Sequence, residues 1–372
     1  MSVFDADQQM LADSVRAVLA KKSDSGAVRS AMESPDRFDR SLWAVLAEQV
    51  GVAGIAIPED FDGSGGGPVE AAIVAEELGR TLTPSPFLGS SGVAAAVILA
   101  TRDTDAKTRL LSTISDGSAI VALCAADGGG QWFGSRPPTI TATERDLARG
   151  DFALSGTAHF VLDAGAATAF VVAARLGTDL ALFEVDATAS GISMTSGASL
   201  DPTRALYDVE FDRTPAGRLE SSDASAALEH AITWGTVLLA AEQAGAAARC
   251  LELTVEYTKS RVQFGRPIGS FQALKHRMAD LYVLVRSARA TAYAAAAAVD
   301  DTEFWHDAAA VAAVYCAESL STVAAECVQL HGGIAITWEH DMQLYFKRAH
   351  SSAQLFGLPR THVRSLASAA GL

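Results

Sequence analysis

The spacing of hydrophobic residues divides the sequence into three stretches, of which the first is helical. Between Phe4 and about Gly117, apolar residues recur every three or four positions, as in QQMLADSVRAVLA and SLWAVLAEQV. Gly, Pro and Asp separate these runs, and an apolar stripe of this period is typical of helices packed on a core. We therefore predict an N-terminal α domain over residues 1–117.

The periodicity changes between Ala119 and about Asp212. Short alternating or β-rich runs follow one another there: AIVALCA, TITATER, AFVVAAR, LALFEV and ALYDVEF. Turn residues interrupt the pattern about every ten positions, which is the spacing expected of strands joined by tight turns. This stretch predicts a small antiparallel β domain, a barrel or sandwich, over residues 118–217.

Helical periodicity returns after PAGRLESSDAS, a segment that offers Ser and Asp as helix caps. Alanine-rich faces such as ATAYAAAAAVD let helix backbones approach closely, as in bundles and subunit interfaces. We expect a C-terminal four-helix bundle over residues 218–372, which makes the whole chain an α+β protein. The four helices are predicted to begin near Ser225, Ser270, Phe304 and Asp341.

Composition narrows the possible functions. The chain has 372 residues, of which 49% are hydrophobic, enough for a sizeable core. Its formal net charge of −15 repels phosphate backbones, and no local basic patch offsets it, so nucleic acid is not an expected partner. The eight histidines show no pair at metal-ligand spacing with a third carboxylate or cysteine, so no metal site is expected.

Cysteine usage and apolar segments bear on location. Cys124, Cys250, Cys316 and Cys327 have neither metal-binding nor redox spacing, and MSVFDADQQM lacks a signal-peptide pattern, so a reducing cytoplasm is expected. The most apolar helical run, AITWGTVLLAAEQAGAAA, carries Glu242 and the adjacent Gln in its middle. It falls short of the ~20 apolar residues of a membrane span, so no membrane insertion is expected.

Two C-terminal stretches, SRVQFGRPIGSFQALKHRMADL and CVQLHGGIAITWEHDMQLYFKRA, carry a family resemblance. They are similar at several fixed points to the acyl-CoA dehydrogenases, and the order of α, β and α domains is that family's architecture. PEDFDGSGGGPVEAAIVAEELGR and LSGTAHFVLDAGAATAFVVAAR resemble its N-terminal and middle signatures, so the resemblance spans nearly the whole chain. It implies the acyl-CoA dehydrogenase fold, FAD as cofactor, an acyl-CoA substrate and an electron-transfer acceptor.

The resemblance also implies cofactor-binding residues that act across a dimer interface. In the family, the turn after the first C-terminal helix presents an Arg to the pyrophosphate and a Phe to the FAD of the neighbouring subunit. The matching residues here are Arg261 and Phe264. A planar guanidinium pairs well with a diphosphate. Gln263 and Gln272 of the same stretch are further candidates, for which a flavin contact and a structural role both stay open.

A second family motif, Q-x-x-G-G, contacts the adenosine-diphosphate half of the same cofactor. It matches Gln329, Gly332 and Gly333. Glycines let the backbone approach a diphosphate closely.

The residue that removes the α-proton in these enzymes is missing. The commoner position of the family's catalytic Glu corresponds to Phe356, which precedes Gly357, and the other position falls on Gly235. Neither residue can accept a proton. Glu242 lies two helical turns beyond Gly235, about 10 Å further along the helix, too far to substitute without rearrangement. The catalytic residue is therefore unknown.

The part of the flavin pocket that a subunit builds for itself is also altered. Where relatives have hydroxyl groups in a loop, this chain reads CAADGGGQW, from Cys124 to Trp132. Where relatives have Trp-x-Thr, the matching positions are Phe160 and Leu162. The family's residues that contact the flavin within the same subunit are thus replaced, whereas its residues that contact the FAD of a neighbouring subunit are present.

This asymmetry indicates the subunit of a heteromeric, α2β2 dehydrogenase that lacks the catalytic Glu, with a related subunit supplying it. By analogy with heteromeric bacterial members of the family, the substrate is expected to be a bulky or sterol-derived acyl-CoA, in lipid metabolism and steroid degradation. Two alternatives stay open: a self-sufficient homotetramer with a relocated base, and a non-enzymatic family member, against which the acidic composition argues.

Overall fold

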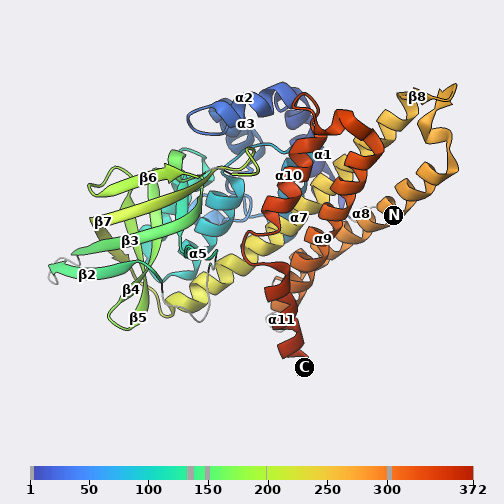
Figure 1. Ribbon diagram of the computed structural model, residues 1–372. Coiled ribbons are helices and arrows are strands. Elements are labelled where there is room, and N and C mark those ends of the chain that lie inside the picture. Colours follow the sequence, from blue (N-terminus) through green and yellow to red (C-terminus); the bar gives the residue numbers. More distant parts are fainter. Residues whose placement is uncertain are drawn as a thin grey trace. The chain divides into compact units, whose positions relative to one another are not determined.

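The computed structural model describes residues 4–130, 132, 138–146, 151–197, 199–299 and 304–371. Helices come first, strands follow, and helices return, in the order that the hydrophobic pattern predicts (Figure 1). The helices are α1 (Ala6–Lys22), α2 (Ser25–Glu33), α3 (Arg40–Val50), α4 (Pro68–Thr81), α5 (Ala95–Ala100), α6 (Thr104–Ser115), α7 (Ala224–Ser260), α8 (Gln272–Ala297), α9 (Trp305–His331), α10 (Met342–Ser352) and α11 (Pro359–Ala369). The strands are β1 (Val121–Cys124), β2 (Thr141–Asp146), β3 (Asp151–Leu162), β4 (Ala169–Leu176), β5 (Asp179–Asp186), β6 (Ile192–Ser196), β7 (Leu206–Leu219), β8 (Val262–Gln263) and β9 (Arg266–Pro267).

Spatial contacts group the chain into two compact units. The helical unit consists of Met1–Val28, Ala72–Thr83 and Thr236–Leu372, and the β unit consists of Arg29–Ala71 and Pro84–Gly235. The three consecutive domains, 1–117, 118–217 and 218–372, stay a prediction, because these units combine segments that are separated in the sequence. The chain passes between the two units four times.

In the β unit the sheet closes on itself. Strands β2, β3, β7, β5 and β4 pair in that order, and β4 returns to β2, while β1 is added on β4 and β6 on β7. The structure departs from the expected antiparallel domain in one respect, because β1 and β2 both run parallel to β4. Two aromatic pairs lie among the aliphatic side chains of the interior: Phe152 meets Phe183 edge-on at 5.2 Å, and Phe170 meets Phe211 edge-on at 6.2 Å.

Within the β unit, the strands β3 and β6 lie outside the runs that the sequence suggests. β3 contains Gly156 at φ 130°, and its register with β7 shifts on either side of Ala158. Such bulges break the strict alternation of inward and outward side chains on which strand prediction depends. β6 is largely exposed and therefore has no buried face to produce an alternating pattern.

In the helical unit, α9 packs against α8, α10 and α11. The four helices expected in this part of the chain are present, and α11 is a further one, with Pro359 in its first turn. At one end, the hairpin of β8 and β9 joins α7 to α8 (Figure 1). Within the described residues, Trp305–Ile336 is long and apolar enough to cross a membrane, but half of its most apolar 18-residue window is buried inside the protein, as in a core helix.

Helices α4 and α7 cross with their backbones close together. A Cβ atom built on Gly79 would lie well inside van der Waals contact with the carbonyl oxygen of Glu242, and one on Gly245 would do the same with Glu76. Each helix therefore carries a glycine where the backbone of the other passes. The two backbones can approach this closely only because both positions lack a side chain.

Buried carboxylates on α4 connect it to the surrounding helices. Glu76, 5% exposed, accepts hydrogen bonds from Arg289 of α8 and from the Tyr293 hydroxyl. The adjacent Glu77, 3% exposed, is bound by Arg16 of α1 at 2.5 and 3.0 Å. Removing one partner of such a pair leaves an uncompensated buried charge, so these pairs fix the position of α4.

The crossing predicts a strong sensitivity to a single methyl group. Gly79→Ala and Gly245→Ala should each lower the free energy of unfolding by at least ~1–3 kcal/mol, because a backbone must move to admit the Cβ. Gly26, a glycine of α2 whose Cβ would meet only Asp24 Oδ1 at 3.4 Å, is the control. Gly26→Ala should be neutral or stabilising by up to ~1 kcal/mol. Urea unfolding of the three variants checks this, and equal behaviour of all three would contradict the tight crossing.

Candidate cofactor-binding site

The hairpin after α7 presents Phe264 to solvent. Phe264 and Gly265 form its two-residue loop, with φ values of 53° and 75°. Positive φ at both central residues is the signature of a type I′ turn, which suits Gly but strains a bulky residue. Phe264 is nevertheless 91% exposed, so burial within its own chain does not offset this strain.

Contacts along the hairpin hold it in a defined shape. The carbonyl oxygen of Arg261 accepts from the backbone N–H of Ile268 at 2.8 Å. The guanidinium of Arg266 lies 4.0 Å from the ring centre of Phe271, and Phe264 meets the same ring edge-on at 6.1 Å. The exposed ring of Phe264 is therefore pre-positioned.

The polar residues expected to bind the cofactor differ in how available they are. The Arg261 side chain is exposed, and no described residue forms a hydrogen bond or ion pair with its guanidinium. Gln272 begins α8 and is exposed as well. Gln263 donates its amide to the carbonyl oxygen of Val262 at 2.8 Å, so part of its hydrogen-bonding capacity is used within the hairpin.

The Q-x-x-G-G turn forms the end of α9. Gln329 is exposed in the last turn of the helix, and Gly332 and Gly333 follow it on the surface. A Cβ built on either glycine would meet nothing within 4 Å. Gly332 adopts a φ of 70°, which only glycine adopts readily. The backbone of this turn is thus open to a ligand.

A stack of aromatic rings brings the hairpin and the glycine turn to the same end of the helical unit. Tyr257, one helical turn before Arg261, stacks on His331 with ring centres 4.5 Å apart, and His340 meets His331 edge-on at 4.8 Å. His331 Nδ1 lies 2.8 Å from the carbonyl oxygen of Cys327, to which it donates. Burial lowers the pKa of His331, so this ring is neutral near pH 7.

These groups suit a dinucleotide. The exposed guanidinium of Arg261, the amide of Gln329 and the accessible glycine backbone are the donors that a diphosphate requires, and Phe264 offers an apolar ring face. The stack of Tyr257 and His331 was not among the expected site residues. Its signal in the sequence is the His directly before the glycine pair, which spacing alone does not connect to a Tyr 74 positions earlier.

In the β unit, the loop from Cys124 is closed by its own groups. Asp127 Oδ1 accepts from the N–H of Gly129 at 2.8 Å, and its carbonyl oxygen accepts from Gly130 at 2.9 Å. The loop contributes no hydroxyl side chain among its described residues, whereas Gln131 of the same stretch lies outside them.

Hydrocarbon side chains occupy the two positions on β3. Phe160 sits at the bulge with a φ of 55° and is 38% exposed, while Leu162 is buried. Between this strand and the loop, the N–H of His159 donates to the carbonyl oxygen of Ala126 at 3.0 Å. The strand therefore supports the loop but offers no hydroxyl to a flavin edge at Phe160 or Leu162.

Gly235 and Phe356, the two positions that the resemblance assigns to the family's base, carry no group that can accept a proton. Gly235 is buried within α7. Phe356, 4% exposed, adopts a φ of 59°, and Gly357 a φ of 121°. The sequence gives no reason to expect His362 here, but its Nε2 would be 3.0 Å from a Cβ on Gly357, and burial lowers its pKa.

Glu242 is held in a structural pair. Its Oε1 accepts from Nη1 of Arg348 on α10 at 2.5 Å, and the two residues are 8% and 3% exposed. The neighbouring Gln243 donates to Ser352 of the same helix at 3.1 Å. A carboxylate that compensates a buried guanidinium is poorly placed to act as a mobile base.

The fold and these sequences define the class of protein. The acyl-CoA dehydrogenase N-terminal domain family matches residues 5–118, and the acyl-CoA dehydrogenase C-terminal domain family matches residues 225–370. The chain belongs to the acyl-CoA dehydrogenase family, which confirms the expected fold and, with it, FAD as the family's cofactor.

Within that family, the chain is similar to acyl-CoA dehydrogenase IpdE2 of Mycobacterium tuberculosis. The two are 44% identical over 362 residues, which cover 97% of this chain and 96% of the other. The fold is also similar to the ChsE4–ChsE5 complex of Mycobacterium tuberculosis, at 27% identity and a TM-score of 0.88, covering 100% of this chain and 99% of that one. A variant of the Tcur3481–Tcur3483 steroid acyl-CoA dehydrogenase matches at 28% identity, a TM-score of 0.86 and 97% of each chain.

Proposed function

We propose that this chain is the subunit of a two-component FAD-dependent acyl-CoA dehydrogenase that binds the cofactor in trans and leaves proton removal to its partner. One contrast supports the proposal. Arg261, Gln329 and the glycine turn are exposed and available, whereas Gly235 and Phe356 occupy both positions of the base.

The chemistry divides between the two subunits accordingly. FAD, when bound, accepts the hydride that leaves the β-carbon of the acyl-CoA. This chain would orient the diphosphate through Arg261 and cover an apolar part of the cofactor with Phe264. The α-proton would pass to a carboxylate of the partner subunit, because the general base must lie within hydrogen-bond reach of that proton.

The partner and the substrate are proposed from the relatives. A solved structure at 27% identity is a complex of two named components, and another at 28% carries a steroid acyl-CoA dehydrogenase in its name. We propose an α2β2 assembly that acts on a bulky or sterol-derived acyl-CoA and passes electrons to an electron-transfer acceptor in the cytoplasm.

A self-sufficient homotetramer would need a base within this chain. Among the described residues discussed above, the candidates are Glu242 and His362. Glu242 is bound by Arg348, and His362 packs on the Phe356–Gly357 turn within a mostly apolar environment. The non-enzymatic alternative is not favoured by any observation in the site.

The trans-binding role predicts that Arg261→Ala lowers flavin occupancy of the assembled complex. Loss of a bidentate contact to diphosphate, worth ~1.5–3 kcal/mol, should raise the Kd for FAD by roughly 10- to 150-fold. Lys259→Ala, which removes an exposed cation two residues away, is the matched control and should leave FAD binding unchanged. Fluorescence titration of the apo complex measures both, and equal Kd values for Arg261→Ala and the parent would show that the turn is only structural.

The proposed division of labour also predicts that neither internal candidate is the base. In the assembled complex at equal flavin content, Glu242→Gln and His362→Gln should retain nearly all acyl-CoA-dependent reduction of an artificial electron acceptor. Glu242→Gln should still lower the free energy of unfolding by ~1–3 kcal/mol, because it removes the charge that Arg348 faces. A relocated base would instead reveal itself through a ~10²–10⁴-fold loss of turnover in one of the two variants.

A further inference from the structure

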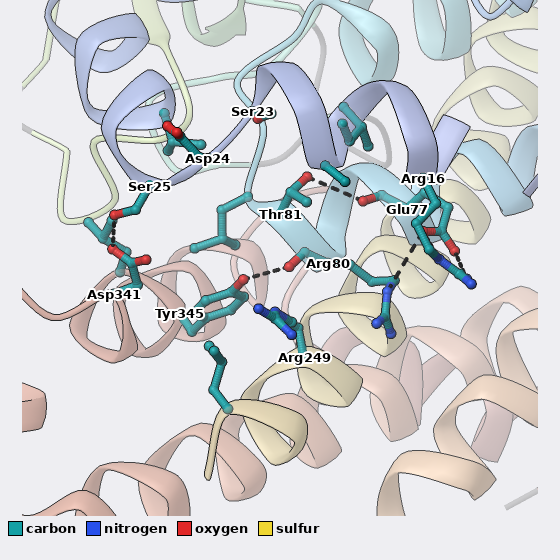
Figure 2. Close-up of a pocket in the computed structure, with 16 residues that line it drawn as sticks. Arg16, Ser23, Asp24, Ser25, Glu77, Arg80, Thr81, Arg249, Asp341 and Tyr345 are labelled. Atoms are coloured by element: carbon teal, nitrogen blue, oxygen red, sulfur yellow. Dashed lines mark hydrogen bonds and ion pairs between the residues drawn. The ribbon is translucent and has the colours of Figure 1, made fainter. Parts of the chain in front are cut away.

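The helical unit contains a cavity that belongs neither to the hairpin nor to the glycine turn. Its volume is about 510 Å³, within the range of small-molecule sites. It lies among α1, the start of α2, the end of α4, the second half of α7 and the start of α10 (Figure 2). Three arginines line it, Arg16 from α1, Arg80 from α4 and Arg249 from α7.

Two of these arginines form close ion pairs with carboxylates. Arg16 binds both carboxylate oxygens of the buried Glu77. One nitrogen of Arg80, Nη2, donates to both oxygens of Glu252 at 2.8 Å. Asp13 approaches Arg16 only at 3.8 Å and does not line the cavity.

Arg249 is the exception. Its only hydrogen bond to a described residue runs from Nη1 to Glu252 Oε2 at 3.3 Å, and that oxygen already accepts from Arg80. A guanidinium has five N–H donors, so most of those of Arg249 remain available. In Figure 2 its side chain lies at the centre of the cavity view, next to the ring of Tyr345.

The other polar groups around the cavity are occupied. The Tyr345 hydroxyl donates to the carbonyl oxygen of Arg80 at 2.5 Å, and Thr81 and Thr83 share a hydrogen bond at 2.6 Å. At another end of the cavity in Figure 2, Ser25 donates to Asp341. Ser23 shares a hydrogen bond with Thr83 at 2.6 Å, and Asp24 accepts from the backbone N–H of Ala27 at 2.8 Å. The remaining lining is apolar: Leu19, Ala20, Val28, Leu82, Leu253 and Leu344.

We propose that this cavity binds an organic carboxylate with an apolar body, its carboxylate paired with Arg249. One available guanidinium matches one monoanionic carboxylate in a bidentate fork. A phosphate dianion would need more free donors than the lining offers. The leucines would cover a chain or ring system, and Asp24 and Asp341 disfavour a second negative charge near them.

The test uses the assembled complex and sodium octanoate as the probe, with octan-1-ol and inorganic phosphate as comparison ligands. Isothermal titration calorimetry should show that octanoate binds. Octan-1-ol, which lacks the carboxylate, and phosphate, which lacks the apolar chain, should each bind at least ~10-fold more weakly. Across hexanoate, octanoate and decanoate, the Kd should fall roughly four-fold for each added methylene that is buried.

Variants then locate the site. Arg249→Gln should weaken octanoate binding by ~10-fold or more. The control is Arg364→Gln, which alters an exposed arginine of α11 outside the cavity and should have no effect. Leu253→Trp, which fills the cavity and keeps all three arginines, should abolish binding by a different route.

Hydrogen exchange gives an independent readout. Octanoate should protect amides of residues 80–82 and 249–253 in the parent but not in Arg249→Gln. Octanoate binding that is absent, equal to that of octan-1-ol, or unchanged in Arg249→Gln would overturn the proposal. Because none of these measurements uses flavin or turnover, their outcome is separate from that of the proposed dehydrogenase function.

Discussion

The close crossing of α4 and α7 is the contact on which the helical unit depends. Gly79 and Gly245 let the two backbones meet, and Glu76 and Glu77, on the same turn of α4, then bind Arg289 and Arg16. The glycines set the distance between the helices, and the ion pairs set their rotation. A side chain at either glycine would disturb both, since the carboxylates are buried and cannot exchange their partners for water.

This arrangement fixes where the candidate cofactor site lies. α7 continues past the crossing to Tyr257, whose ring stacks on His331 at the end of α9. The hairpin with Arg261 and the turn with Gly332 are thereby carried by two long helices, each anchored in the same core. Sites built on such elements hold their geometry better than sites on free loops. The exposed residues of this end are thus held in a fixed geometry, as the proposed contact with a second subunit requires.

The order of helices and strands could be predicted from hydrophobic periodicity because most elements bury one face. Prediction failed where burial does not alternate from one strand residue to the next: β3 is interrupted by Gly156 and a bulge, and β6 has no buried face. The short helix α11 was not predicted as a separate element. It follows Phe356 and Gly357, whose positive φ values interrupt the helical backbone, and a bulky residue such as Phe356 rarely adopts that conformation.

The candidate site was only partly accessible from sequence for a similar reason. The residues Arg261, Gln329 and Gly332 belong to local motifs, so a resemblance could identify them. The pairing of Glu242 with Arg348 and the stacking of Tyr257 on His331 join residues far apart in the chain, and their meeting depends on helix packing. The under-paired guanidinium of Arg249 is likewise visible only once its neighbours have been placed.

The central claim is that this chain needs a partner to hold FAD productively. The direct measurement is the amount of FAD bound per chain after purification of this chain alone and after co-expression with a family member that carries the catalytic Glu. The account predicts a colourless or poorly soluble product for the single chain, because its own loop offers no hydroxyls to a flavin edge, and a yellow complex for the pair. A soluble homotetramer of this chain with one FAD per subunit, reduced by acyl-CoA without a partner, would contradict it.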